Sequence, residues 1–388
     1  MTALALDLEG GAVLRPGAAL PEPGRLSIAG GRIVAARQGR AVDLSGYLVL
    51  PGIVDLHGDG FERHVAPRRG AMKTLEAGVI AAEAELAANG ITTAVMAQFW
   101  SWEGGLRGPE FAARMMVAIA DTRPRVVTDL QAQLRFETHM LDDYPALPGR
   151  LAEWGVRYLV FNDHLPHDRL AAGRRPPRLT GQALKAGRNP ERHLEIMQAL
   201  HRRGPELPAA LDALCRDLRA RGVILGSHDD RSAEDRAAWH RRGVGVAEFP
   251  ETAAAAEAAR ALGDAVVMGA PNVVRGGSHN GNLSAIEAVA MGLCDALASD
   301  YHYPSLRRAA LLLAETGLCD LGAAWAMISD RPARILGLAD RGSLAPGLRA
   351  DLTILEARSG RVMATLAQGR VSFMTGASWA SGALPGRV

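Results

Sequence analysis

Apolar and polar residues alternate in two different rhythms along the middle of this chain. Short apolar runs typical of buried strands occupy residues 51–56, 91–97, 130–136, 156–161, 223–226, 244–249, 265–269 and 295–299. Alanine-rich segments with helical spacing occupy residues 73–89, 109–121, 146–154, 206–221, 232–242, 252–262, 283–292 and 304–316. This alternation predicts parallel strands with helices between them. Eight such units over roughly 250 residues suit a (β/α)8 TIM barrel, with a doubly wound sheet as the alternative.

The two ends of the chain have a β-like pattern that the middle lacks. Within the first 50 residues, Gly30-Gly31 separates two short apolar runs, which is a hairpin signal. Residues 350–357 and 361–373 are β-like as well. We therefore expect residues 1–50 and 341–388 to form one composite β domain, and residues 51–340 to form the barrel. The polar, basic stretch at about 165–205 is interpreted as an insertion after the fourth barrel strand.

Composition narrows the class of protein. The chain has 388 residues, of which 48% are hydrophobic, and a net charge of +2, which gives no nucleic-acid footprint. Its three cysteines form no C-x-x-C pair, which argues for a reducing compartment. The N-terminus lacks the basic segment of a signal peptide, and no apolar run reaches about 20 residues. We expect a cytoplasmic protein with neither nucleic acid nor membrane as its partner.

Aspartate, glutamate or histidine residues follow at least five of the apolar runs. These positions are the carboxyl ends of the predicted strands, where the active sites of barrel enzymes lie. Their residue types suit a divalent metal, with zinc, manganese or iron(II) as candidates and one or two ions sharing a carboxylate. Residues i and i+2 of a strand point the same way, so the first two of these side chains would face one ion together. The candidate ligands are His57, Asp59, Glu137, His164, His228 and Asp300.

Each of these residues also has a plainer interpretation, since a single histidine at a strand end is usually solvated or hydrogen-bonded. The joint pattern over several strands favours metal ligands. His167 competes with His164 for one position, and His139 and Glu248 compete with Glu137 for another. Asp229 and Asp230 are interpreted as helix-capping or supporting groups.

Two further segments suggest an anionic substrate. The segment APNVVRGGSHNGN after the seventh strand would offer backbone N–H groups to phosphate, with side chains beside them. Its candidate binding residues are Arg275, Gly276, Gly277, Ser278, His279 and Asn282. A basic cluster after the first strand contains Arg63, His64, Arg68 and Arg69, of which Arg63 and Arg68 are the candidate phosphate ligands. The alternative for the first segment is a glycine turn that needs positive φ. The alternative for the second is a set of ordinary solvated arginines.

The motifs resemble a known family. PGIVDLHGDG is similar to the first-strand signature of the amidohydrolase superfamily, and ADLTIL near the C-terminus suits its split β domain. LPGIVDLHGDGFERHVAPR, GSHDD, AEFPET, VMGAPNVVRGGSHNGN and ASDYHYPSL together resemble the PhnM family, the α-D-ribose 1-methylphosphonate 5-triphosphate diphosphatases. The resemblance implies a distorted barrel with a small β-sandwich built from both termini. It also implies metal-dependent hydrolysis of a ribose 5-triphosphate that releases pyrophosphate, with Asp300 as the proton acceptor.

The chain departs from that pattern at one point of the first-strand motif. The family more often has H-T-D-N where this chain has His57-Gly58-Asp59-Gly60, so a substrate or supporting hydrogen bond is lost and the substrate could differ. One alternative is an enzyme with the same fold and metals that cleaves the C–N bond of a small cyclic amide. Such a substrate would give Arg63, Arg68 and Arg275 nothing to bind. Another is a metal-free scaffold, against which the complete ligand set argues. The expected partner is a small polyanionic substrate, and a homo-oligomer stays open.

Overall fold

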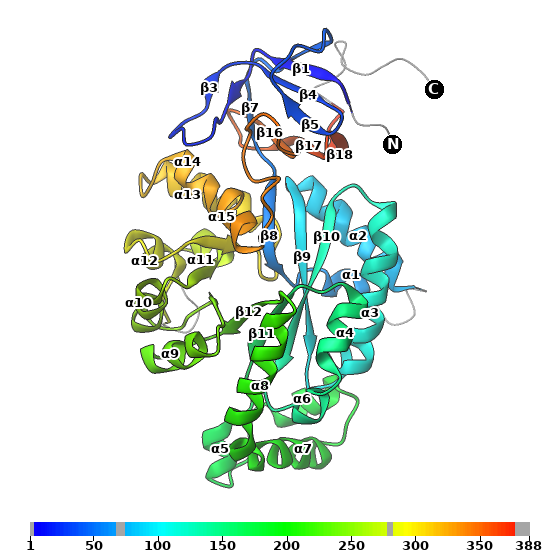
Figure 1. Cartoon of the computed structure of the whole chain (residues 1–388), viewed down its shortest axis with the longest axis vertical. Coiled ribbons are helices and arrows are strands. Elements are labelled where there is room, and N and C mark those ends of the chain that lie inside the picture. Colours follow the sequence, from blue (N-terminus) through cyan, green and yellow to red (C-terminus); the bar gives the residue numbers. More distant parts are fainter. Residues whose placement is uncertain (1–3, 67–73, 278–281, 377–388) are drawn as a thin grey trace. The chain divides into compact units, whose positions relative to one another are not determined.

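The computed structural model describes residues 4–66, 74–277 and 282–376 (Figure 1). Eight parallel strands follow one another in chain order in one sheet. They are β8 (Ile53–Gly58), β9 (Ile91–Trp100), β10 (Asp129–Glu137), β11 (Tyr158–Asn162), β12 (Ile224–His228), β13 (Val246–Glu248), β14 (Ala265–Gly269) and β15 (Ala296–Ala298). A parallel bridge joins Gly58, at the end of the first strand, to Asp300, after the last. The predicted (β/α)8 barrel is confirmed, and the doubly wound alternative is wrong because such a sheet reverses its strand order partway.

The helices between these strands lie where the alanine-rich segments predicted them. They are α2 (Leu75–Ala88), α3 (Pro109–Thr122), α4 (Leu147–Trp154), α8 (Leu207–Ala220), α9 (Ala233–Arg241), α10 (Ala253–Leu262), α12 (Ala285–Ala290) and α13 (Ser305–Glu315). Four begin at a serine or threonine whose hydroxyl accepts a first-turn backbone N–H, namely Thr74, Ser232, Thr252 and Ser284. The short helices α1 (Glu62–Val65), α11 (Ala270–Arg275), α14 (Leu321–Ala326) and α15 (Asp330–Ile335) were not predicted.

Two sheets built from the chain ends form the sandwich. One has the order β5 (Arg32–Val34), β4 (Leu26–Ala29), β1 (Leu6–Glu9) and β6 (Ala41–Asp43). The other has the order β18 (Arg370–Met374), β17 (Val362–Ala367), β16 (Leu352–Glu356), β7 (Tyr47–Pro51), β2 (Ala12–Val13) and β3 (Glu22–Pro23). Leu8 and Ile28 of the first sheet share one apolar core with Val49 and Ile354 of the second. The predicted β-sandwich from both termini is confirmed, whereas its boundaries at residues 50 and 341 stay a prediction.

By its contacts the chain divides into two compact units. Residues 1–96, 121–131 and 267–388 form the first unit, and residues 97–120 and 132–266 form the second. The insertion belongs to the second unit and is helical, with α5 (His167–Ala171), α6 (Leu179–Lys185) and α7 (Pro190–Arg202). Its apolar residues pack in a small cluster with Trp102, which follows β9; the residues of the insertion are Leu165, Leu170, Leu179 and Met197.

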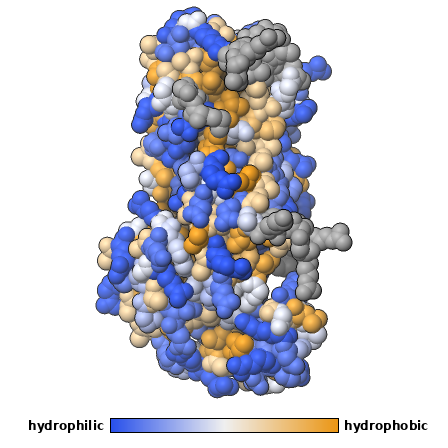
Figure 2. Space-filling view, turned by 90° about the vertical axis from the view of Figure 1, so that its right-hand side faces the viewer, coloured by the Kyte–Doolittle hydropathy of each residue, from blue (hydrophilic) through white to orange (hydrophobic). Residues whose placement is uncertain are grey.

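The described surface is mixed rather than dominated by one patch. Figure 2 shows hydrophobic residues scattered among hydrophilic ones on the face in view. The large apolar side chains that are exposed come from many elements, namely Leu20, Leu106, Val117, Leu184, Leu262, Met291, Tyr301 and Leu318. Among the helices of the described ranges, none has both the length and the apolar content that crossing a membrane requires.

Candidate active site

The first group of candidate ligands lies in the first unit, at the carboxyl ends of β8 and β15. His57 is fully buried near the end of β8, and Asp59 and Asp300 follow the two strands. The Asp59 N–H donates to the Asp300 carbonyl over 2.8 Å, and the Asp300 N–H donates to the His57 carbonyl over 3.1 Å. Ligand atoms of the three side chains lie within 4.8 Å of one another. One imidazole and two carboxylates at this spacing could hold a divalent metal.

Asp300 has a backbone conformation that non-glycine residues rarely adopt, with φ at 56°. Asp229, directly after β12, has φ at 61°, and Phe249, directly after β13, has φ at 53°. Such left-handed residues cost on the order of 1–3 kcal/mol and cluster at functional sites. Three barrel strands therefore end in the backbone strain that is typical of such a site.

A buried carboxylate that sequence reasoning missed supports the first group. Asp55 accepts the Ser299 N–H over 3.1 Å and the Ser299 hydroxyl over 2.5 Å, and is fully buried. Burial raises the pKa of the Asp55 carboxyl, against the opposing effect of these hydrogen bonds. A Cβ on Gly58 would lie 2.8 Å from Asp55 Oδ2, 2.8 Å from Ser299 Oγ and 2.9 Å from Tyr303 Cε1. A side chain at position 58 would therefore require these three neighbours to shift.

The basic cluster after β8 is partly neutralised. Arg63 forms an ion pair with Glu85, donates to the Tyr301 carbonyl over 3.0 Å and lies over the Tyr303 ring. The His64 Nε2 lies 2.6 Å from the same Glu85 carboxylate. Burial alone would raise the pKa of Glu85, but Arg63 and His64 outweigh it and lower the pKa. Arg68 and Arg69 lie outside the described residues, so only Arg63 and His64 of this cluster have a known position.

The second group of candidate ligands lies in the second unit, at the ends of β10 and β11. Glu137 is fully buried at the end of β10, and its carboxylate contacts His164 Nδ1. The Glu137 Oε2 also accepts the His164 N–H and the Trp102 indole N–H, each over 3.2 Å. Burial lowers the pKa of His164, but the Glu137 carboxylate outweighs it and raises the pKa. Glu137 and His164 are thus brought together, as an ion pair when the imidazole is protonated.

His228, at the end of β12, contacts two side chains in the same unit. The Arg135 Nη2 lies 2.9 Å from His228 Nε2, and an Asp229 oxygen lies 3.0 Å from His228 Nδ1. Arg135 has no lone pair to offer, so its guanidinium donates and the Nε2 accepts. The buried Arg135 also stacks on the Phe99 ring, 3.9 Å from its centroid. Sequence reasoning missed Arg135, which engages one of the two ring nitrogens through which His228 could bind a metal.

The competing carboxylate Glu248 lies at the end of β13 and has polar partners of its own. The Gln133 amide donates to its Oε1 over 2.7 Å, and the Tyr158 hydroxyl donates to the same oxygen over 2.5 Å. Burial, together with the charge of Glu248, raises the pKa of Tyr158 well above its usual value. The Glu248 carboxylate is therefore held within the second unit by two donors, the Gln133 amide and the neutral Tyr158 hydroxyl.

The glycine loop is only partly described. Arg275 ends α11, and its Nη2 donates to the Asn272 side-chain oxygen over 2.9 Å. Gly276 follows with φ at 79°, the left-handed turn that glycine favours, and Gly277 and Asn282 border the gap in the description. Ser278 and His279 lie outside the described residues. The phosphate-binding role of this loop stays a prediction.

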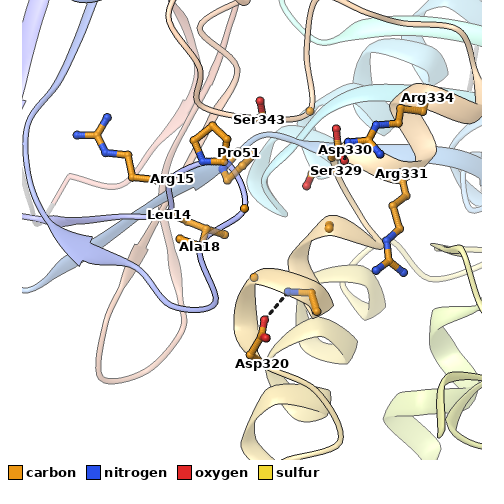
Figure 3. Close-up of a pocket in the computed structure, with 16 residues that line it drawn as sticks. Leu14, Arg15, Ala18, Pro51, Asp320, Ser329, Asp330, Arg331, Arg334 and Ser343 are labelled. Carbon is orange, nitrogen blue, oxygen red and sulfur yellow. Dashed lines mark hydrogen bonds and ion pairs between the residues drawn. The ribbon is translucent and has the colours of Figure 1, made fainter. Parts of the chain in front are cut away.

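A cavity of about 430 Å³ lies in the first unit (Figure 3). It is bordered by Pro51, which precedes β8, and by Arg331 and Arg334 of α15. Figure 3 also shows Asp320, whose carboxylate accepts the Ala323 N–H over 2.7 Å at the start of α14. The six residues of β8 separate its amino end from Asp59 by roughly 20 Å. The cavity therefore lies at the end of β8 opposite to Asp59.

Comparison with known proteins identifies the family. No family model matches the chain. The chain is 33% identical over 353 residues to the alpha-D-ribose 1-methylphosphonate 5-triphosphate diphosphatase of Escherichia coli (strain K12), covering 87% of this chain and 92% of that protein.

Solved structures with the same fold include an amidohydrolase, with a TM-score of 0.66 and 13% identity over 96% of this chain and 100% of that chain. They also include a 5-methylcytosine deaminase from Klebsiella pneumoniae, with a TM-score of 0.60 and 15% identity over 95% of this chain and 97% of that chain. These likenesses show the fold alone, whereas the sequence relative extends over nearly all of its own length. The chain therefore belongs to the PhnM family, and is a hydrolase of the amidohydrolase superfamily.

Proposed function

We propose that this protein is a metal-dependent diphosphatase that cleaves the 5-triphosphate of ribose 1-methylphosphonate and releases pyrophosphate. The observation that carries the proposal is the 33% identity to the Escherichia coli diphosphatase over 92% of that protein. The side chains that the chemistry requires are present at the ends of the barrel strands, in two groups that each combine imidazole with carboxylate.

The proposal assigns both groups to one reaction. Their residues follow strands of the same parallel sheet at the carboxyl end, where barrel enzymes carry their active sites. His57, Asp59 and Asp300 would hold one divalent ion, and Glu137, His164 and His228 would complete the centre. Zinc is the expected metal, with manganese and iron as alternatives. A bound divalent ion supplies a water of lowered pKa and neutralises charge on phosphoryl oxygens.

Asp300 has the position and the type of a general base. Its backbone is fixed on both sides, by the Asp59 N–H and by the His57 carbonyl, which places the residue beside the other two candidate ligands. In the proposed reaction it takes the proton of the attacking water and then passes it to the leaving pyrophosphate. The bond between the α- and β-phosphates breaks, and the ribose keeps its methylphosphonate and one 5-phosphate.

Arginines would bind the triphosphate. Arg275 is exposed, and its planar guanidinium matches phosphate oxygens in fork geometry. Arg63 is 43% exposed and shares its charge with Glu85, so its contribution would be weaker. A cyclic amide would need neither charge, which is why the phosphate substrate is favoured over C–N cleavage.

The test is a substrate panel with purified protein. Ribose 1-methylphosphonate 5-triphosphate, nucleoside triphosphates and a cyclic amide are each incubated with the enzyme, and pyrophosphate, orthophosphate and amide cleavage are measured. Pyrophosphate from the ribose triphosphate supports the proposal, and it should vanish in Asp300→Asn. Asp212→Asn, which removes an exposed carboxylate on α8, is the matched control. Release of orthophosphate alone, or cleavage of the amide alone, would overturn the proposal.

A further inference from the structure

A cluster of imidazoles and one carboxylate lies in the second unit, beside the predicted ligands but distinct from them. His139 follows β10 and is buried, Asp163 follows β11, and His167 begins α5. Ligand atoms of the three side chains lie within 4.8 Å of one another. The His167 Nε2 is 2.9 Å from one Asp163 oxygen, and the His139 Nδ1 is 3.6 Å from the other.

A third histidine supports the cluster from α7. The His201 Nδ1 lies 2.8 Å from the His167 Nδ1, and the two ring centroids are 5.0 Å apart. In a pair of neutral imidazoles one of the two nitrogens must donate and the other accept. This contact leaves His167 Nε2 directed at Asp163. A histidine that ligates a metal through one nitrogen usually has its other nitrogen fixed in this way.

We propose that His139, Asp163 and His167 bind a divalent transition metal, with His201 as a positioning residue. Two imidazoles and a carboxylate suit zinc, and the remaining coordination position would be taken by water. Ligands about 2.0–2.1 Å from zinc lie roughly 3.4 Å apart in a tetrahedron. The Asp163 Oδ1 lies 3.2 Å from His167 Nε2 and 3.6 Å from His139 Nδ1, so two edges of such a tetrahedron are already close to that value.

The position of the cluster indicates what this metal would do. It joins the segments after β10 and β11 to α5, the first helix of the insertion, and His201 extends the link to α7. Asp163 and His167 are 39% and 36% exposed, so an ion can enter from solvent. The ion would fasten the insertion to the strand ends of the second unit, and it would stabilise the folded protein because it binds there and not to the unfolded chain.

Metal content tests the site directly. The purified parent, His167→Ala and Asp163→Asn are dialysed against zinc and then buffer, and zinc per chain is measured. Each variant should hold one zinc fewer per chain than the parent. His240→Ala is the matched control, because His240 is similarly exposed and also contacts an aspartate, Asp264. Equal zinc in parent and variants would overturn the proposal.

A second measurement, limited proteolysis, tests whether the ion attaches the insertion to the strand ends. Trypsin should cleave the exposed residues Arg174 and Arg178, which lie between α5 and α6. Zinc should slow this cleavage at least several-fold relative to EDTA in the parent and in His240→Ala, but not in His167→Ala. His201→Ala should weaken zinc affinity about 10–100-fold, which is typical of a lost supporting contact. Equal rates of trypsin cleavage in zinc and in EDTA for the parent would overturn the structural role of the ion.

These outcomes are separable from the proposed function. His57→Ala removes a predicted ligand of the catalytic centre, so it should keep the zinc-dependent protection from trypsin. If no substrate is hydrolysed, the zinc count in His167→Ala still decides whether this second site exists.

Discussion

The two groups of candidate ligands are held in different ways. In the first unit, His57, Asp59 and Asp300 are positioned by backbone hydrogen bonds between the segments that end β8 and β15. In the second unit, Glu137 and His164 contact each other directly, and His228 accepts a hydrogen bond from Arg135. The first group is therefore placed by the fold, whereas the second is held by its own side chains.

This difference has a consequence for metal binding. Two carboxylates of the first group approach each other, which favours a cation between them. In the second group, a metal that binds His228 through Nε2 must displace Arg135. It can bind His164 through Nε2 while Nδ1 stays in contact with Glu137, but the Glu137 carboxylate already has His164 and Trp102 as partners. We therefore expect changes in the first group to affect chemistry and metal content most, and changes in the second group to reveal the hydrogen bonds that the metal replaces.

The largest expected effect is that of Asp300→Asn. The amide cannot accept the proton of the attacking water, so turnover should fall by at least about 1,000-fold while a metal stays bound. Steady-state rates of pyrophosphate release measure the loss. A rate within about tenfold of the parent would remove Asp300 from its assigned role.

His57→Ala should come next, through loss of metal rather than of a base. The imidazole is fully buried, so no solvent-exposed residue can easily replace it. Elemental analysis should show lower metal content, with a parallel loss of activity that added zinc partly restores. His240→Ala serves as control, and unchanged metal content in His57→Ala would contradict the ligand assignment.

Arg275→Ala should have a smaller effect that is confined to the substrate. Removing one guanidinium from a phosphate site should raise the KM for the triphosphate about tenfold or more, with metal content unchanged. Arg260→Ala, which removes a guanidinium from α10, gives the control. Equal KM values for Arg275→Ala and the parent would exclude the predicted phosphate loop as a binding element.

The smallest effect concerns the second group and depends on pH. The pKa of His164 is raised by Glu137, so in metal-free protein the pair stabilises the fold fully below the unfolded histidine pKa of about 6.5. That contribution is lost as pH rises through the folded pKa. Glu137→Gln should therefore cost about 1–3 kcal/mol at pH 6 and less at pH 9.

Urea denaturation of metal-free parent and Glu137→Gln at the two pH values measures this difference. Gln is nearly the same size as Glu, so packing is preserved, but its amide keeps only one of the two acceptor oxygens that contact His164 and Trp102. The lost hydrogen bond gives a penalty at both pH values, and the difference between them reports the charge. A penalty that is equal at both pH values would show that the Glu137–His164 pair does not contribute as an ion pair.

The fold was predictable because its signals are local. Each barrel strand is a short apolar run, and the helices between the strands are alanine-rich segments, four of which begin at a serine or threonine cap, so the alternation is visible without any long-range information. Predicting the strands also predicted where each one ends, so His57, Asp59 and Asp300 could be chosen as candidates. The structure brings these three side chains together.

The supporting residues were not predictable because their partners are far away in the sequence. Asp55 contacts Ser299 across 244 positions, and Arg135 contacts His228 across 93. In the sequence, Asp55 is one acidic residue in a strand motif and Arg135 is one cation in an apolar run. Only the pairing of distant strands shows that each is buried with a partner, which burial of charge requires.

Gly58 constrains how this site can change over evolutionary time. Because side-chain atoms of Asp55, Ser299 and Tyr303 lie within 3 Å of the place that a Cβ on Gly58 would take, a larger residue there requires these side chains to shift. A substitution at position 58 is therefore coupled to the groups at positions 299 and 303, which lie more than 240 residues downstream. Among related sequences, substitutions in the first-strand motif and in the SDYHY segment should therefore covary.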